Sequence, residues 1–324
     1  MADADRGVAS QRPLCPVIFS HSIPRRTDRL VTETSANTTA PATNAVPAVA
    51  LKDARLSFGA RTLWDGLDLE VQPGEFIAVL GPNGSGKTSL LKILLGQLQL
   101  SGGSAEIAGT PARAGNSHVG YIPQQKSIDD GLPLRGRDLV GLGVDGHQWG
   151  TGLLRRGRRR AIVDNAIAQV SAEAFADAPI GSMSGGEQQR LRIAQALVGD
   201  PKILLCDEPL LSLDLANQHL VSTLIDKRRR THNTAVLFVT HEINPILPLV
   251  DRVLYLVDGK FRIGTPAEVM TSKVLSDLYN TDVEVLQVRG RLVVVGTGDA
   301  IDALGSAGGL RPGEGVHHSD EDHA

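Results

Sequence analysis

One glycine-rich loop constrains this chain more than any other segment, and its residues are Gly81-Pro82-Asn83-Gly84-Ser85-Gly86-Lys87-Thr88. The loop follows an apolar run at residues 76–80 and precedes a helix-forming run at residues 89–95, which predicts a strand, a loop and a helix in that order. Glycines at a helix N-terminus let backbone N–H groups surround an anion, which the helix dipole also favours. The full pattern predicts a phosphate-binding loop rather than an ordinary glycine-rich turn.

The loop also predicts a role for its side chains in binding a nucleotide. We expect residues 81–88, together with Ser89, to surround the phosphates. Lys87 should reach the β- and γ-phosphates, and the hydroxyl of Thr88 should bind the Mg²⁺ that accompanies them. The loop by itself does not indicate what the energy of the nucleotide is used for.

Composition narrows the class of protein. The 324 residues suffice for one large domain or two small ones, and a hydrophobic content of 41% supports a substantial core. The net charge of −3 gives no global basic field, so we expect no nucleic-acid partner, and the basic runs at 155–160 and 227–230 are typical of solvated faces. Two cysteines, Cys15 and Cys206, suggest no disulfide framework and fit a reducing cytoplasm. The sequence predicts no membrane span and no secretory signal.

The chain divides into four predicted segments. Residues 1–47, rich in Ala, Thr, Ser, Pro and Arg, should be disordered, and residues 48–282 should form an α/β domain. Within it, residues 124–184 should form an inserted helical subdomain. Residues 283–297 surround Arg289-Gly290 and predict a β-hairpin, and residues 298–324 predict a flexible tail rich in His and Asp. Periodicity predicts strands over 54–58, 67–71, 76–80, 203–206 and 235–239, and helices over 88–98, 185–198 and 215–229.

Two carboxylates follow the apolar strand at 203–206. Asp207 is placed to hold Mg²⁺ beside Thr88, often through water. Glu208 can orient a water against the γ-phosphate. The alternative is a solvated strand end, which is common for an Asp-Glu pair that stands alone.

A second glycine-bearing helix start has the sequence Ser184-Gly185-Gly186-Glu187-Gln188-Gln189-Arg190. Ser184 can cap the helix, and the glycines allow a phosphate to approach the free N–H groups. The alternative is a serine-capped helix after a glycine turn. Because one nucleotide should not need two such helix starts, we expect this one to serve the nucleotide of another subunit.

Taken together, these motifs resemble those of the ATPase subunits of ABC transporters, over about residues 49–278. Residues 81–88 match the family's Walker A motif, residues 203–207 its Walker B motif, and Glu208 its catalytic glutamate. Residues 184–188 match the signature motif, with Met183 in place of the usual Leu and Glu187 in place of the usual Gln. The resemblance implies an α/β P-loop NTPase fold with a RecA-like core, an antiparallel β subdomain and an inserted α-helical subdomain.

The same resemblance assigns roles to two further polar residues. Gln124, after Tyr121-Ile122-Pro123, matches the Q-loop glutamine, which touches the metal or a water when its loop moves. His241, after the strand at 235–239, matches the switch histidine, which donates to the γ-phosphate and holds the attacking water. The alternatives are a polar residue in a proline-induced turn and a structural histidine at a strand end. We expect Glu208, His241 and Gln124 to be catalytic, and Thr88, Gln124 and Asp207 to hold Mg²⁺.

The base of the nucleotide and the partner subunit should engage other residues. Phe58, before Gly59, falls where the family places the aromatic that stacks on adenine, although it could equally belong to the core, with Trp64 as a less favoured substitute. Asp214 matches the D-loop position that touches the partner's nucleotide site, and its alternative is a helix N-cap. With Ser184, Gly185, Gly186 and Glu187, it completes the expected nucleotide-binding set.

The resemblance implies an ATP-driven switch built from several chains. Two copies should sandwich ATP head to tail, and hydrolysis should release them. Separate transmembrane permease subunits and an extracellular solute-binding protein should complete an importer, with this chain held peripherally at the cytoplasmic face of the cell membrane.

The cargo is suggested by segments around two of these motifs. Residues 120–134 and 240–245 resemble those of the zinc and manganese uptake group, in which a short acidic stretch follows the Q-loop. The tail residues 317–323 are rich in metal-capable ligands, although a polar, solvated end explains them as well. The alternatives are another cargo such as iron or a siderophore, an exporter, a member without turnover, and a soluble ABC ATPase that acts on ribosomes or DNA.

Overall fold

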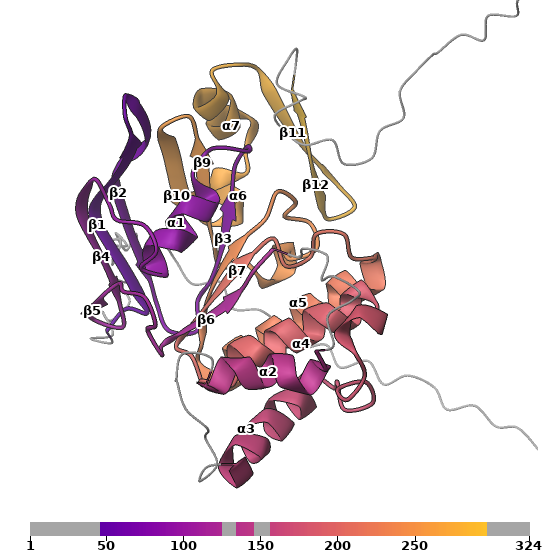
Figure 1. Ribbon diagram of the computed structural model, residues 1–324. Coiled ribbons are helices and arrows are strands. Elements are labelled where there is room, and N and C mark those ends of the chain that lie inside the picture. Colours follow the sequence, from indigo (N-terminus) through magenta and orange to yellow (C-terminus); the bar gives the residue numbers. More distant parts are fainter. Residues whose placement is uncertain (1–45, 125–133, 146–155, 297–324) are drawn as a thin grey trace, which may run out of the picture. The chain divides into compact units, whose positions relative to one another are not determined.

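The computed structural model describes residues 46–124, 134–145 and 156–296, which Figure 1 draws as a coloured ribbon. Most of the expected N-terminal extension, the expected C-terminal tail with residues 317–323, and the acidic stretch at 128–131 lie outside these residues. The domain limits at 48–282 and 124–184 therefore stay predictions.

A six-stranded sheet carries the phosphate loop and has the strand order β10-β9-β3-β8-β7-β6. In chain order its members are β3 (Phe76–Leu80), β6 (Val119–Ile122), β7 (Ile203–Asp207), β8 (Ala235–Val239), β9 (Arg252–Val257) and β10 (Lys260–Gly264). The strands from β9 to β6 run parallel to one another, whereas β10 is antiparallel to β9. Val239 pairs with both Val79 and Asp207, so β3, β7 and β8 end at the same edge.

Two antiparallel sheets accompany the central one. The first has the order β2-β1-β4-β5 and is formed by β1 (Val49–Phe58), β2 (Arg61–Val71), β4 (Gly102–Ile107) and β5 (Thr110–Pro111). The second is the hairpin of β11 (Val283–Val288) and β12 (Arg291–Gly296), which turns at Arg289 and Gly290, both with positive φ. A hairpin was expected over residues 283–297, and β11 and β12 pair from Val283 to Gly296.

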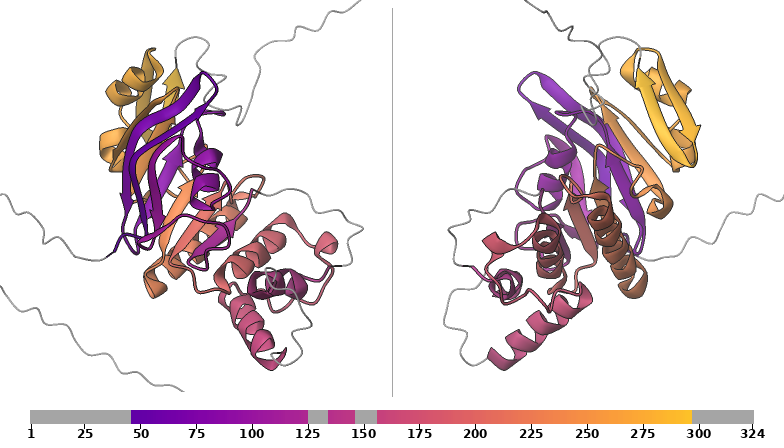
Figure 2. Two further views of the ribbon diagram at one scale, coloured as in Figure 1. Left: turned by 60° about the vertical axis from the view of Figure 1, so that its left-hand side comes forward. Right: turned by 90° about the vertical axis from the view of Figure 1, so that its right-hand side faces the viewer.

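Seven α-helices occur among the described residues, together with short 3₁₀ turns at Ile180–Ser182 and Leu247–Leu249. The helices are α1 (Lys87–Leu94), α2 (Gly136–Asp145), α3 (Arg156–Gln169), α4 (Gly185–Leu197), α5 (Leu215–His232), α6 (Pro266–Val269) and α7 (Ser272–Tyr279). Helices α2, α3 and α4 pack on one another, as Figure 2 shows. A search of these helices finds none with the length and apolar character that crossing a bilayer requires.

The central sheet separates two hydrophobic cores because its buried strands alternate their side chains between faces. In β3, Ile77 and Val79 pack toward the first antiparallel sheet and α1, while Phe76, Ala78 and Leu80 face the other core with α4 and α5. All five of these side chains are buried. A sheet covered on both faces is what continuous apolar strands predict.

Several element limits differ from those expected. The helix after the phosphate loop ends at Leu94 rather than residue 98, because Gly96 adopts positive φ and closes the turn. Strands β1 and β2 extend well beyond the expected segments because they pair along nearly their whole length. Strands β4, β5, β6, β9 and β10 were not expected. Pairing with strands distant in the sequence places β4, β6 and β9 in their sheets, whereas β5 and β10 each pair with the strand directly before them in the chain.

Candidate nucleotide site

The phosphate loop lies between β3 and α1. At two of its glycines, a residue with a side chain would not fit. Gly81 has φ 139°, and a Cβ there would lie 2.0 Å from the carbonyl oxygen of Leu256. Gly86 caps α1 with φ 100°, and a Cβ there would lie 2.8 Å from Nε1 of Trp64. The close approach of neighbouring groups, and not only flexibility, explains why glycine occupies both positions.

Lys87 is folded back into the loop. Its Nζ donates hydrogen bonds to the carbonyls of Gly81 at 2.6 Å and Pro82 at 2.8 Å. Burial lowers the pKa of the Lys87 ammonium, and the negative charges of Glu208 and Asp207 oppose that shift. The Ser85 hydroxyl is also buried and has no hydrogen-bond partner within the described chain. A buried cation and an unsatisfied hydroxyl in a glycine loop fit a bound phosphate.

Thr88 and Asp207 come together from different elements, the start of α1 and the end of β7. The Thr88 hydroxyl donates to Oδ1 of Asp207 over 3.4 Å. Burial, and then the neighbouring charge of Glu208, raise the pKa of the Asp207 carboxyl, while Thr88 and Lys87 oppose the shift. A hydroxyl and a carboxylate at this spacing are the hard oxygen ligands that suit Mg²⁺.

Glu208 and His241 form the other pair at this edge. Oε2 of Glu208 lies 3.5 Å from Nδ1 of His241. The hydrogen bond to His241 lowers the pKa of Glu208, and the same bond raises the pKa of His241. Glu208 has φ 47°, and its backbone N–H donates to the carbonyl of Val239 at 3.0 Å. This contact to β8 turns the chain after β7 and aims the carboxylate at the histidine.

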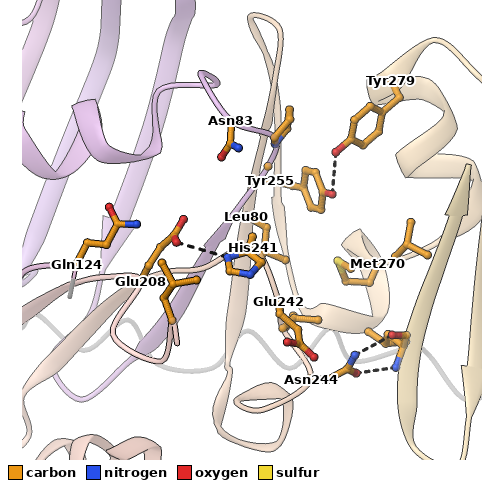
Figure 3. A pocket seen from close by; sticks show the side chains of 16 residues that line it. Leu80, Asn83, Gln124, Glu208, His241, Glu242, Asn244, Tyr255, Met270 and Tyr279 are labelled. Carbon is orange, nitrogen blue, oxygen red and sulfur yellow. Dashed lines mark hydrogen bonds and ion pairs between the residues drawn. The ribbon is translucent and has the colours of Figure 1, made fainter. Parts of the chain in front are cut away.

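A cavity of about 470 Å³ opens in front of this pair, as Figure 3 shows. Gln124, Asn83, Glu208 and His241 line one part of it, so the expected catalytic residues share one space. The other part is walled by buried or half-buried apolar and aromatic groups, namely Ile243, Tyr255, Met270, Tyr279, Leu292 and Val294. Parallel strands commonly place ligand sites outside their carboxyl ends, which is where this cavity lies.

A second cavity, of about 360 Å³, lies on the other side of the loop. Phe58 lines it together with Lys87, Thr88 and Ser89, and its side chain is half exposed. Trp64 is fully buried beneath Gly86, so the alternative that placed Trp64 against the base is wrong. The reason is that Trp64 occupies an inward-facing position of β2, whereas Phe58 ends β1 at the tip of the hairpin.

The signature residues are not part of either cavity. Ser184 and Glu187 form a capping box on α4, in which the N–H and Oγ of Ser184 donate to Glu187 at 2.8 Å and the N–H of Glu187 donates to Ser184 Oγ at 3.3 Å. A Cβ at Gly186 would lie 2.2 Å from Oδ1 of Asn217. Within one chain the local alternative, a serine-capped helix, is therefore observed.

Asp214 is likewise a helix cap. Its carboxylate accepts hydrogen bonds from the backbone N–H of Asn217 at 2.8 Å and from the Asn217 side-chain amide at 2.7 Å. The structure thus brings together the loop, Asp207, Glu208, His241 and Gln124, whereas Ser184, Gly186 and Asp214 line neither of these two cavities.

Sequence reasoning missed three residues near these cavities. Arg61 lines the cavity of Phe58, and its only signal was a basic residue three positions after that aromatic. The side-chain amide of Asn244 forms two hydrogen bonds with the backbone of Leu292 in β12, and Figure 3 draws both as dashed lines. Its Oδ1 accepts from the Leu292 N–H at 2.8 Å, and its Nδ2 donates to the Leu292 carbonyl at 2.9 Å. Tyr255 hydrogen-bonds Tyr279 at 3.1 Å, and no local pattern pairs the two.

The family model described as ABC transporter matches residues 64–211. The zinc import ATP-binding protein ZnuC of Pseudomonas fluorescens (strain Pf0-1) is 32% identical over 242 residues, which cover 74% of this chain and 85% of that protein. The ZnuC of Roseobacter denitrificans is 32% identical over 226 residues, covering 70% of this chain and 82% of its own length.

Two solved structures share the fold. A chain described as a metal-chelate type ABC transporter in an inward-facing conformation has a TM-score of 0.66 and 25% identity, covering 79% of this chain and 99% of its own. The cbiO1 protein of Clostridium perfringens, part of the complex cbiONQ, has a TM-score of 0.61 and 23% identity, covering 72% and 94%. The first-listed sequence relatives and both structures are thus matched over most of their own length.

Proposed function

The chain belongs to the ATP-binding subunits of ABC transporters, and from that premise we propose that it powers the import of a divalent metal ion, zinc ahead of manganese. It is an ATPase. The observation that carries the proposal for the site is the meeting of the phosphate loop, Asp207, Glu208 and His241 at one edge of the central sheet.

Each side chain at this edge has a proposed part in the reaction. Lys87 and the N–H groups of the loop hold the phosphates, and Phe58 stacks on the adenine. Thr88 and Asp207, together with Gln124, would hold Mg²⁺, which would offset negative charge on the phosphates.

Glu208 and His241 act on the water that attacks the γ-phosphate. The Glu208 carboxylate accepts a hydrogen bond from the water and orients it. His241 donates a hydrogen bond to the phosphate oxygens, where negative charge develops. In the structure the two side chains contact each other, so contacts to the water and to the phosphate would replace that contact.

A second copy of the chain completes the site in this proposal. Ser184, Gly186 and Asp214 lie outside both cavities of their own chain. A head-to-tail dimer would bring these residues of one copy to the nucleotide held by the other. ATP then joins the two copies, and its hydrolysis separates them.

Separate permease subunits and an extracellular solute-binding protein complete the proposed importer, which places this chain at the cytoplasmic face of the membrane. The relatives named zinc import ATP-binding proteins support zinc as the cargo. An ATPase subunit does not touch the cargo, so the proposal for the metal rests on sequence similarity to these relatives. The proposal for the ATPase site rests on the geometry of its residues.

Metal uptake by cells that lack this chain tests the proposal. We expect reduced accumulation of Zn²⁺ and, to a smaller degree, of Mn²⁺, with Fe²⁺ unchanged. Wild type and Glu284→Ala, an exposed control on β11 that lies outside every motif, should restore uptake, while Lys87→Ala and Glu208→Gln should not. Unchanged uptake of all three metals would remove the metal from the proposal. Equal ATP hydrolysis by wild type and Glu208→Gln would remove the catalytic assignment.

A further inference from the structure

Arg61 stands at the mouth of the nucleotide cavity and has no part in the motifs described above. It begins β2, directly after the turn at Gly59 and Ala60, and its Cα is paired with that of Phe58 across the hairpin. Residues directly opposite each other in an antiparallel pair project to the same face of the sheet. The guanidinium and the aromatic ring therefore enter the same cavity as neighbours, and both line it.

The guanidinium reaches the phosphate loop itself. Nη2 of Arg61 donates to the carbonyl of Gly84 at 3.3 Å. Lys87 contacts the loop at its other limb, through the carbonyls of Gly81 and Pro82. Two cations therefore contact the phosphate loop at different carbonyls. Arg61 contacts it on the side where Phe58 lies.

Within residues 46–124, 134–145 and 156–296, the charge of Arg61 has no partner of opposite charge. Among the residues that the structure describes, no carboxylate forms an ion pair with Arg61, whereas Arg55 on the neighbouring strand pairs with Asp65 at 3.8 Å. Glu208 lines the same cavity but pairs with His241. A guanidinium has five N–H donors, and the bond to Gly84 uses one of them.

We propose that Arg61 is a nucleotide-binding residue. Its guanidinium binds the phosphates of the nucleotide from the side of Gly84, while Phe58 stacks on the base. This inference rests on the nucleotide site proposed above and adds a second cation to it. A planar guanidinium suits phosphate oxygens, and it binds them more strongly than the single neutral carbonyl that it contacts in the structure. A residue that only braced the loop would not need a charge.

Equilibrium binding to the purified full-length chain tests this inference without relying on turnover. Kd values for ATP, ADP and adenosine are measured by competition against a fluorescent ATP analogue. We expect Arg61→Ala and Arg61→Gln to raise the Kd for ATP and ADP about tenfold, and to leave the Kd for adenosine unchanged. Arg61→Lys should recover part of the loss. The Kd of Arg61→Gln should also depend less steeply on salt than that of wild type.

Arg55→Ala is the matched control, because it removes an exposed arginine of the same sheet that already has a carboxylate partner. It should bind ATP as wild type does. Wild-type Kd for ATP in Arg61→Gln, or an equal loss for ATP and adenosine, would overturn the inference and leave Arg61 as a brace for Gly84. Thermal melting identifies that case, since a brace lowers Tm in all three Arg61 variants without a difference between ATP and adenosine. Wild-type ATP affinity in Lys87→Ala would instead refute the nucleotide site as a whole.

Discussion

At the scale of single residues, the candidate site is a set of charges held in place by strand ends. Lys87 is only 6% exposed, and burial lowers the pKa of its ammonium, while burial raises the pKa of the Asp207 carboxyl. Both shifts disfavour the charged forms. A polyphosphate and a divalent cation would supply the opposite charges that each group lacks, so the electrostatics of the site favour such ligands.

The Glu208–His241 pair predicts how stability depends on pH. Because the folded state raises the pKa of His241 above its ordinary value of 6.5, the pair's contribution is fully present below pH 6.5 and is lost as pH rises through the raised value. Glu208 and Glu242 raise that pKa, while burial and Lys87 oppose the shift. With His241 35% exposed, the effect should be about 0.5 kcal/mol.

Urea denaturation of wild type and His241→Gln, without nucleotide, measures this effect. The difference in unfolding free energy should be larger at pH 6 than at pH 8.5. A difference that stays the same at the two pH values would contradict the ion pair.

We expect the substitution of Gly81 to lower the free energy of unfolding by more than the loss of glycine's backbone freedom explains. Gly81→Ala would place a Cβ 2.0 Å from the carbonyl oxygen of Leu256 at a φ of 139°, so the strand end must shift. We expect a loss of about 2–4 kcal/mol of unfolding free energy in urea denaturation. The control is Gly115→Ala, where φ is 72° but nothing lies within 4 Å, and it should cost about 1 kcal/mol. Equal losses would show that the contact with Leu256 does not matter.

At the scale of elements, helix starts and strand ends were predictable, while the pairing between elements was not. The starts of α4 and α5 follow from Ser184 and Asp214, because a cap bonds its own helix within three residues. Strands β9 and β10 were missed although Asp258-Gly259 between them is a two-residue turn typical of a β-hairpin, whereas the parallel pairing of β9 with β3 has no local signal. The contact of Asn244 with Leu292 of β12 likewise has no local signal, because the two residues are far apart in the sequence.

The two hydrogen bonds between Asn244 and Leu292 predict that Asn244 restrains the C-terminal hairpin. In Asn244→Ala, the N–H of Leu292 loses its acceptor, and its amide should exchange with deuterium about tenfold faster. The amide of Val285, which Ser272 holds through its hydroxyl at 2.9 Å, serves as the internal control and should exchange as in wild type. Unchanged exchange at Leu292 would mean that pairing within the hairpin alone protects it.

At the scale of the whole molecule, the separation of the signature residues from the loop argues for association of two copies. Ser184 lies outside both cavities that adjoin the phosphate loop. A single chain therefore contains every residue proposed to hold the phosphates and the water, and lacks only the groups that would cover them.

This arrangement predicts that ATP binding and dimerisation can be separated by mutation. In the Glu208→Gln background, which should slow hydrolysis, ATP should convert monomers to dimers in size-exclusion chromatography with light scattering. Adding Ser184→Arg should abolish the dimer and leave the ATP Kd of the monomer unchanged, whereas adding Lys87→Ala should abolish both. A dimer that forms despite Ser184→Arg would refute the proposed interface.

The sequence by itself determined the phosphate loop, the carboxylates after β7 and the starts of α4 and α5, because each depends on contiguous residues and on hydrogen bonds within a few positions. Only the tertiary structure decided that Glu208 meets His241, that Trp64 is buried under Gly86, and that Arg61 reaches Gly84. These contacts depend on the strand order β3-β8-β7 and on the register of the β1–β2 hairpin, which long-range packing selects among many pairings that the same local patterns allow.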